Sequence, residues 1–147
     1  MNTTILWLIR YGHVLGGAMW VGGYALLALV IVPIMQRSPG EALERLAINV
    51  VRILTYAGMG TIFFGLLLIT RTRGFDRLFT GEWGFIIVTC IVTAIALLGV
   101  GDGGLRPALQ RLTATGDGRA ARRWAVAGLV LTVLATGLMT RALYARS

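Results

Sequence analysis

The sequence predicts an all-α integral membrane protein, a four-helix bundle in which neighbouring helices are antiparallel. Of its 147 residues, 56% are hydrophobic and only 14% are charged, whereas soluble domains carry about 25% charged residues. Four charge-free stretches each approach the ~20 residues that a helix needs to cross a membrane, and only helices satisfy the whole backbone within such a stretch. We therefore expect a single transmembrane domain over residues 1–147. The expected spans are residues 6–35, 50–70, 83–101 and 122–142.

The first stretch runs from Tyr11 to Met35 and is interrupted only by His13 and Pro33. Ser38 and Glu41 follow it with the spacing of a capping box, in which a serine caps a helix start and a glutamate answers three residues later. We therefore expect a second helix to begin there and to continue into the second span.

The third stretch is followed by the segment Gly101-Asp102-Gly103-Gly104. Glycine is a poor helix former, so this segment should end the third span. Leu105 to Leu112 would then form a short amphipathic helix on the membrane surface. Gly116 to Gly118 should form the turn before the last helix. The two halves of the sequence show no clear repeat.

All fourteen basic residues are arginines, and they give a net charge of +8. They lie between the apolar stretches, which predicts contact with anionic lipid headgroups and excludes nucleic acid as the partner. The first and third connections hold seven of them: Arg37, Arg45, Arg106, Arg111, Arg119, Arg122 and Arg123. The other side holds six: Arg10, Arg71, Arg73, Arg77, Arg141 and Arg146. The fourteenth, Arg52, lies on the second helix near its expected cytoplasmic edge. The excess predicts that both termini lie on the non-cytoplasmic side of the cytoplasmic (inner) membrane.

His13 is the only histidine and lies within the first span, where an ionisable group suggests a function. Residues three, four and seven positions later share its helix face. These are Gly16, Gly17 and Trp20, with Gly23 one turn beyond. The imidazole would then stand beside a surface without side chains, as a flat ligand requires.

Arg10 lies one turn closer to the membrane edge, where it could meet an acidic group of such a ligand. A b-type haem would use all three features, because it has an iron for the imidazole, a planar apolar ring and two carboxylates. The pattern leaves two other interpretations open. The glycines could serve close helix packing, with His13 hydrogen-bonded to a neighbouring helix, or His13 could bind another metal.

The segment from His13 to Gly23 resembles the first helix of the CopD-like and HemJ-like membrane proteins. In those families a His is followed by a Trp seven residues later and by a Gly three residues after that, as in His13, Trp20 and Gly23. Weaker similarities lie in three further segments: Gly81–Trp83, Leu105–Leu109 and Thr136–Met139.

HemJ-like proteins are protoporphyrinogen oxidases that bind b-type haem through the first-helix His, so the resemblance implies that His13 is an axial ligand. The chain departs from that family in two ways. It has no Lys, whereas the family has a functional Lys in the third helix, and Tyr24 to Val30 replaces a Leu-Pro-Arg signature. Protoporphyrinogen oxidase activity is therefore not expected, and we assign no catalytic residue.

A haem iron can take a second axial ligand, and antiparallel helices would bring three sulfur side chains to the depth of His13. These candidates are Met59, Cys90 and Met139. One alternative is a homodimer that shares one haem between two copies of His13, and another is a five-coordinate iron without a second ligand.

We therefore expect a b-type haem-binding membrane protein that acts in electron transfer or haem handling. It could be an accessory subunit of a larger respiratory or photosynthetic complex. One alternative is a scaffold subunit without a cofactor, and the other is a copper-handling protein like the CopD type.

Overall fold

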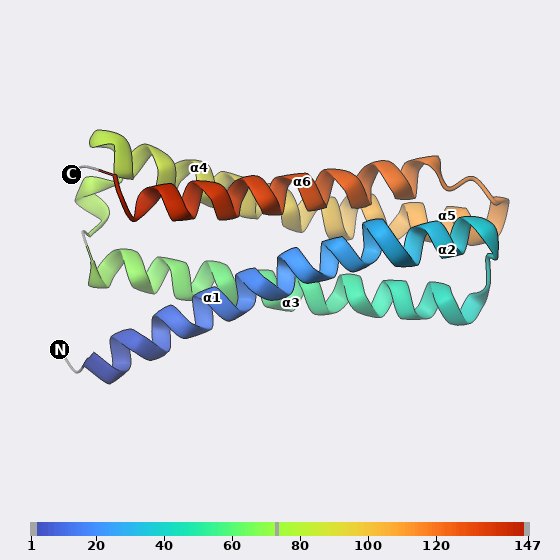
Figure 1. Ribbon diagram of the computed structural model, residues 1–147, viewed down its shortest axis with the longest axis horizontal. Coiled ribbons are helices and arrows are strands. Elements are labelled where there is room, and N and C mark those ends of the chain that lie inside the picture. Colours follow the sequence, from blue (N-terminus) through green and yellow to red (C-terminus); the bar gives the residue numbers. More distant parts are fainter. Residues whose placement is uncertain (1–2, 73, 146–147) are drawn as a thin grey trace.

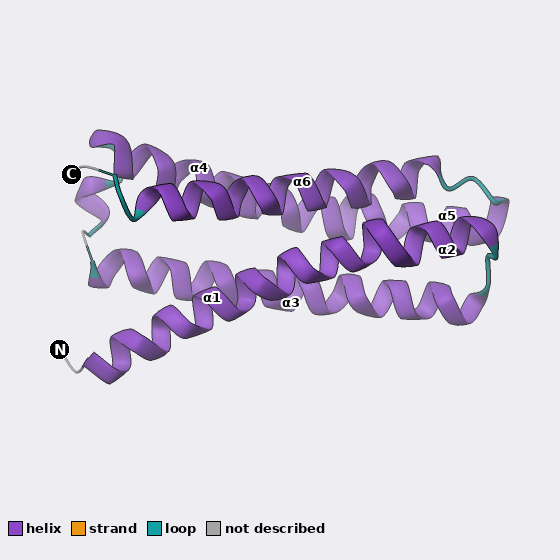
Figure 2. Ribbon diagram, viewed as in Figure 1, coloured by secondary structure: helices purple, strands orange, loops and turns teal. Residues whose placement is uncertain are grey.

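The computed structural model describes residues 3–72 and 74–145, which form a bundle of long helices with no strand among them (Figures 1 and 2). Four of these helices are long and apolar enough to cross a membrane: Thr3–Arg37, Glu41–Arg71, Gly81–Thr115 and Arg119–Ala142. The all-α four-helix architecture expected from the sequence is therefore confirmed.

The long helices divide into shorter elements where the backbone hydrogen-bond pattern changes. In chain order these are α1 (Thr3–Leu26), the π-helical η1 (Leu27–Ile31), α2 (Val32–Arg37), α3 (Glu41–Arg71), the 3₁₀ turn η2 (Phe75–Arg77), α4 (Gly81–Leu98), the π-helical η3 (Gly99–Leu105), α5 (Arg106–Thr115) and α6 (Arg119–Ala142).

The first and third long helices share one feature, a π-helical segment just before a proline. Pro33 follows η1 and Pro107 follows η3. A proline has no N–H to donate, and its ring collides with the carbonyl four residues earlier. The wider π turn accommodates both effects without ending the helix. Two hairpins of similar build therefore pack together, although the sequence shows no repeat.

The prediction that the third span ends at Gly101–Gly104 is wrong, as is the prediction of a separate surface helix after it. The glycines lie within η3, and the helix continues to Thr115. Leu105, Leu109 and Leu112 are all 0% exposed. Burying each leucine stabilises the fold by about 1.5–3 kcal/mol, which exceeds the cost of about 1 kcal/mol for a glycine in a helix.

The predicted capping box is also wrong. Ser38 ends α2, and its backbone N–H donates to the carbonyl of Ile34 at 2.9 Å. The residue that caps α3 is Gly40, and no side chain takes part in the cap. The chain turns so tightly between α2 and α3 that the serine serves the end of one helix instead of the start of the next.

The four long helices are arranged as a square. α1 packs against α3 and α6, and α4 also packs against α3 and α6, so α1 and α4 lie on a diagonal. We call the end that holds Thr3 and Arg141 the terminal end, and the end that holds Ser38 and Gly116 the loop end. The described chain begins and ends at the terminal end (Figure 1).

Two apolar cores hold the bundle together. The larger one fills the loop end and the middle of the bundle, with members from all four long helices, among them Tyr24, Leu54, Leu97 and Ala125. The smaller one lies at the terminal end and joins α4 and α6 to Ile69 of α3. No residue from the first half of α1 belongs to the smaller core.

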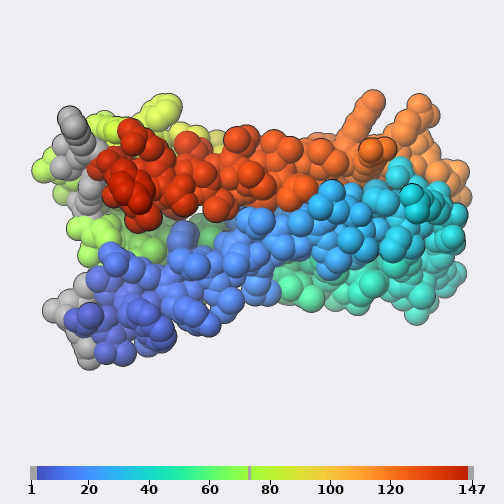
Figure 3. Space-filling view, viewed as in Figure 1, coloured from blue at the N-terminus to red at the C-terminus, as the bar shows by residue number. Residues whose placement is uncertain are grey.

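The first half of α1 therefore packs on α3 and diverges from α6 towards the terminal end (Figure 1). In the space-filling view a furrow separates this half of α1 from α6, with α3 visible at its floor (Figure 3). We call this feature the furrow. It is the place where the bundle is least tightly closed.

Candidate functional site at His13

His13 lies on α1 against the middle of α3. Its Nδ1 atom is 2.9 Å from the backbone carbonyl oxygen of Thr61. Its Cε1 atom would be 3.0 Å from a Cβ added at Gly65. Thr61 lies two residues from Met59, which the antiparallel arrangement predicted at the depth of His13.

The hydrogen bond to Thr61 determines which ring nitrogen of His13 holds the proton. A carbonyl oxygen can only accept, so Nδ1 must be the donor in this bond. In the neutral ring Nε2 then has a free lone pair, and no hydrogen bond within the described parts of the chain uses it. Metal-binding histidines have this arrangement, in which one nitrogen donates to a carbonyl and the other binds the metal.

The direction in which His13 faces follows from Tyr24 on the same helix. Tyr24 is 1% exposed, and its hydroxyl reaches the carbonyl of Leu97 on α4, so this face of α1 points to the bundle centre. At about 100° per residue, His13 and Gly17 lie within about 20° of the same direction, and Arg10 within about 40°. These three residues therefore lie on the face of α1 that borders the furrow, and the imidazole of His13 rests on α3 at Thr61 and Gly65.

The glycines near His13 do not all share one surface. A Cβ added at Gly16 would collide with Thr61, and one added at Gly23 would collide with Leu54. The indole of Trp20 lies directly on Gly58 of α3. These positions form the close contact between α1 and α3, as the helix-packing interpretation of the glycines requires.

Gly17 is different, because no atom lies within 4 Å of a Cβ placed there. Of the residues expected to form a flat surface beside His13, Gly17 is open, whereas α3 covers Gly16, Trp20 and Gly23. Arg10, one turn nearer the terminal end, is exposed and has no ion-pair partner within residues 3–72 and 74–145.

The three sulfur candidates have different surroundings. Met59 is 56% exposed on the outside of α3, and Cys90 is 6% exposed within the smaller core. Met139 is partly exposed and packs at the edge of that core. Within the described residues, no three His, Cys, Asp or Glu side chains come together as a metal site.

The role of Tyr24 was not predicted from the sequence, where Tyr24 was noted only as the first residue of the segment that replaces the Leu-Pro-Arg signature. Its hydroxyl donates to Leu97 at 2.9 Å, and its ring lies on Gly128 of α6. A signal was present, since Tyr24 lies 11 residues after His13 and therefore close to the same helix face.

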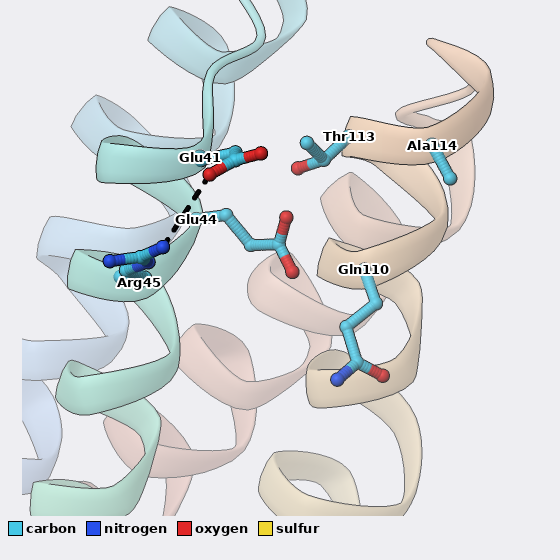
Figure 4. Close-up of a pocket in the computed structure, with 6 residues that line it drawn as sticks. All are labelled: Glu41, Glu44, Arg45, Gln110, Thr113 and Ala114. Carbon is cyan, nitrogen blue, oxygen red and sulfur yellow. Dashed lines mark hydrogen bonds and ion pairs between the residues drawn. The ribbon is translucent and has the colours of Figure 1, made fainter.

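A polar hollow of about 410 Å³ lies between α3 and α5 at the loop end, far from His13 (Figure 4). Its lining residues are Glu41, Glu44, Arg45, Gln110, Thr113 and Ala114. Arg45 and Glu41 form an ion pair of 3.5 Å along the same helix, and both side chains are highly exposed. The hollow is open to its surroundings and contributes nothing to the site at His13.

No protein family, no curated protein and no solved structure matches this chain.

Proposed function

We propose that this chain is an integral membrane protein that binds one b-type haem at His13 and takes part in electron transfer or haem handling. The observation that supports this best is the state of the imidazole. Its Nδ1 donates to the Thr61 carbonyl, and its Nε2 makes no hydrogen bond within the described residues. A haem iron needs one such neutral imidazole nitrogen.

The surroundings of His13 agree with the shape and charge of a haem. The ring is planar and apolar, and Gly17 offers an open backbone surface one turn from the imidazole. The haem carboxylates would lie towards the membrane edge, where Arg10 is exposed and free to pair with them. The bound group would supply a one-electron iron couple, and the chain would orient it and exclude water.

The first test is an absorption spectrum of the detergent-purified protein, air-oxidised and then dithionite-reduced, with a pyridine haemochrome assay. We expect a Soret band and sharp reduced α and β bands. His13→Ala should lose the haem while the bundle still inserts into the membrane. A His13→Ala variant with the full haem content would contradict the proposed axial ligand.

A second test uses the two open glycines of α1. Neither Gly17 nor Gly22 has an atom within 4 Å of an added Cβ, so a larger side chain should be tolerated by the haem-free fold at both positions. Gly17→Leu should lower the haem content because it fills the surface beside His13. Gly22→Leu is the matched control and should keep the haem content of the unmodified chain.

A cofactor-free packing subunit is the second candidate. It is favoured by the way Gly16, Gly23 and Gly58 let α1 and α3 approach closely. A protein that has no Soret band and does not take up added haem would support it. Copper without a Soret band would instead support the copper-handling alternative.

We further propose that the loop end faces the cytoplasm and that the membrane is the inner membrane. The structure places seven arginines of the predicted cytoplasmic group at or near the loop end, on α2, α3, α5 and α6. Of the opposing group, Arg73 and Arg146 lie outside the described residues. A reporter enzyme that is active only outside the cytoplasm should be active when it is fused to the C-terminus. The same reporter in the Ser38–Gly40 turn should be inactive.

Association with a larger membrane complex, or with a second copy of the chain, remains part of this proposal. The outer face of α1 supports it, because Trp7 and Tyr11 stack there with ring centroids 5.4 Å apart and both rings are exposed. Aromatic residues at this depth also suit the lipid interface. Mild-detergent purification followed by mass analysis of the intact particle would separate a monomer from an assembly.

A further inference from the structure

The contact between Tyr24 and Gly128 gives the register between α1 and α6. Gly128 of α6 lies directly against the ring of Tyr24, and any Cβ at Gly128 would collide with that ring. Tyr24 faces the bundle centre, so Gly128 marks the face of α6 that looks towards α1. Because the two helices are antiparallel neighbours, the register of all other residues can be counted from this contact.

Counting towards the terminal end brings two residues to the same depth. His13 lies 11 residues before Tyr24, and Met139 lies 11 residues after Gly128. Both steps cover about 16 Å along the axis at ~1.5 Å per residue, and both return to within about 20° of the starting direction. No π-helical segment interrupts either stretch. His13 and Met139 therefore face each other across the furrow.

We propose that Met139 is the second axial ligand of the haem at His13, which rests on the haem proposal above. The iron would then be held between α1 and α6, with an imidazole on one side and a thioether on the other. A thioether binds as a neutral group, and the flexible methionine side chain can adjust its reach. Met139 packs only at the edge of the smaller core, so its sulfur can turn towards the furrow.

The other two sulfur residues are less well placed. Met59 is 56% exposed on the outside of α3, whereas its neighbour Gly58 lies against Trp20 of α1. Cys90 reaches a similar depth, but α4 lies diagonally across from α1, and the thiol is enclosed by the smaller core. A thiol must also lose its proton before it binds a metal.

The test is Met139→Leu in the full-length, haem-loaded protein, with leucine chosen because it conserves the volume of methionine. We expect the haem content to remain that of the unmodified chain, while the oxidised iron changes from low spin to high spin. The midpoint potential should fall, because methionine ligation raises it. Met59→Leu and Cys90→Ala are the controls and should leave both spin state and potential unchanged.

Met139→His extends the test, because a second imidazole should restore the low-spin state at a lower potential. A Met139→Leu protein that stays low spin with an unchanged potential would overturn the assignment, as would the expected change appearing in a control variant. An unmodified protein without haem would overturn the proposed function and this ligand together.

A cross-linking experiment separates the placement of the two residues from haem binding. In a Cys90→Ala background without haem, His13→Cys combined with Met139→Cys should react with a bifunctional thiol reagent whose length matches the reach of an imidazole and a thioether that bind one iron from opposite sides. His13→Cys combined with Gly137→Cys is the control and should not react, because Gly137 lies nine residues after Gly128 and therefore on the opposite face of α6. A reaction in the second pair alone would refute the facing arrangement, even if the protein binds haem.

Discussion

The hydroxyl of Tyr24 donates a hydrogen bond of 2.9 Å to the backbone carbonyl of Leu97, on the helix diagonally opposite its own. Tyr24 thereby spans the whole bundle, and its ring also rests on Gly128 of α6. The bond lies just before η3 begins at Gly99. Between this bond and the loop end the helices pack tightly, whereas between it and the terminal end α1 diverges from α6.

Removing this hydroxyl tests how much the bundle depends on that bond. We expect Tyr24→Phe to lower the free energy of unfolding by about 1 kcal/mol, since the Leu97 carbonyl loses a buried partner. Unfolding in a mixed detergent titration, followed by circular dichroism, would measure this. Tyr56→Phe is the matched control, because Tyr56 is 68% exposed and should show no change. Equal stability of both variants would argue against a structural role for the bond.

The close approach of α6 to Tyr24 requires a glycine at position 128. Gly128→Ala places a methyl group against the Tyr24 ring, and we expect a loss of about 1–3 kcal/mol in unfolding free energy. Gly137→Ala on the same helix meets no atom within 4 Å and should be neutral or stabilising by up to about 1 kcal/mol. The reverse order of the two variants would show that α1 and α6 do not meet at this contact.

A polar contact joins α3 to the π-helical η3, where the Thr55 hydroxyl donates to an Asp102 carboxylate oxygen at 2.8 Å. Thr55→Val should cost about 1 kcal/mol, less than a fully buried charged bond, because the Asp102 side chain is 45% exposed. Thr93→Val is the control, since the Thr93 hydroxyl bonds only to its own helix. A double-mutant cycle with Asp102→Ala, which removes the acceptor, should show coupling, and additive effects would contradict the contact.

Asp117 stabilises the start of α6 in a way that depends on pH. The pKa of its carboxyl is lowered, chiefly because it accepts a hydrogen bond from the backbone N–H of Arg119 at 3.1 Å. The folded state therefore releases this proton more readily than the unfolded state. The stabilisation is fully present above the ordinary pKa of about 4 and disappears as the pH falls through the lowered value.

This dependence can be measured by comparing the unmodified chain with Asp117→Asn. The difference in unfolding free energy should be constant near neutral pH and should shrink in acid. If the difference in unfolding free energy between the unmodified chain and Asp117→Asn grew in acid, the sign would be opposite to the expected one and the proposed role of Asp117 would be refuted.

Much of the fold could be predicted from the sequence because a membrane imposes a simple rule. Long apolar stretches must be helical, and their charged flanks mark the ends. Predictions of helix ends from short sequence patterns failed where side-chain packing favoured a different backbone. The Gly101–Gly104 segment does not end a helix, because Leu105 and the leucines after it are buried by packing that no local pattern reveals. The capping box failed because Ser38 completes α2 instead.

For the site, the sequence alone predicted that His13 lies within the first span and that glycines share its helix face. It could not predict which glycines a neighbouring helix would cover, because the sequence shows which residues share a helix face but not which helix packs on that face. Only the tertiary structure showed that α3 packs on Gly16 and Gly23 and leaves Gly17 open. The register between α1 and α6, which sets Met139 opposite His13, also depends on how side chains fit at the contact of Tyr24 with Gly128.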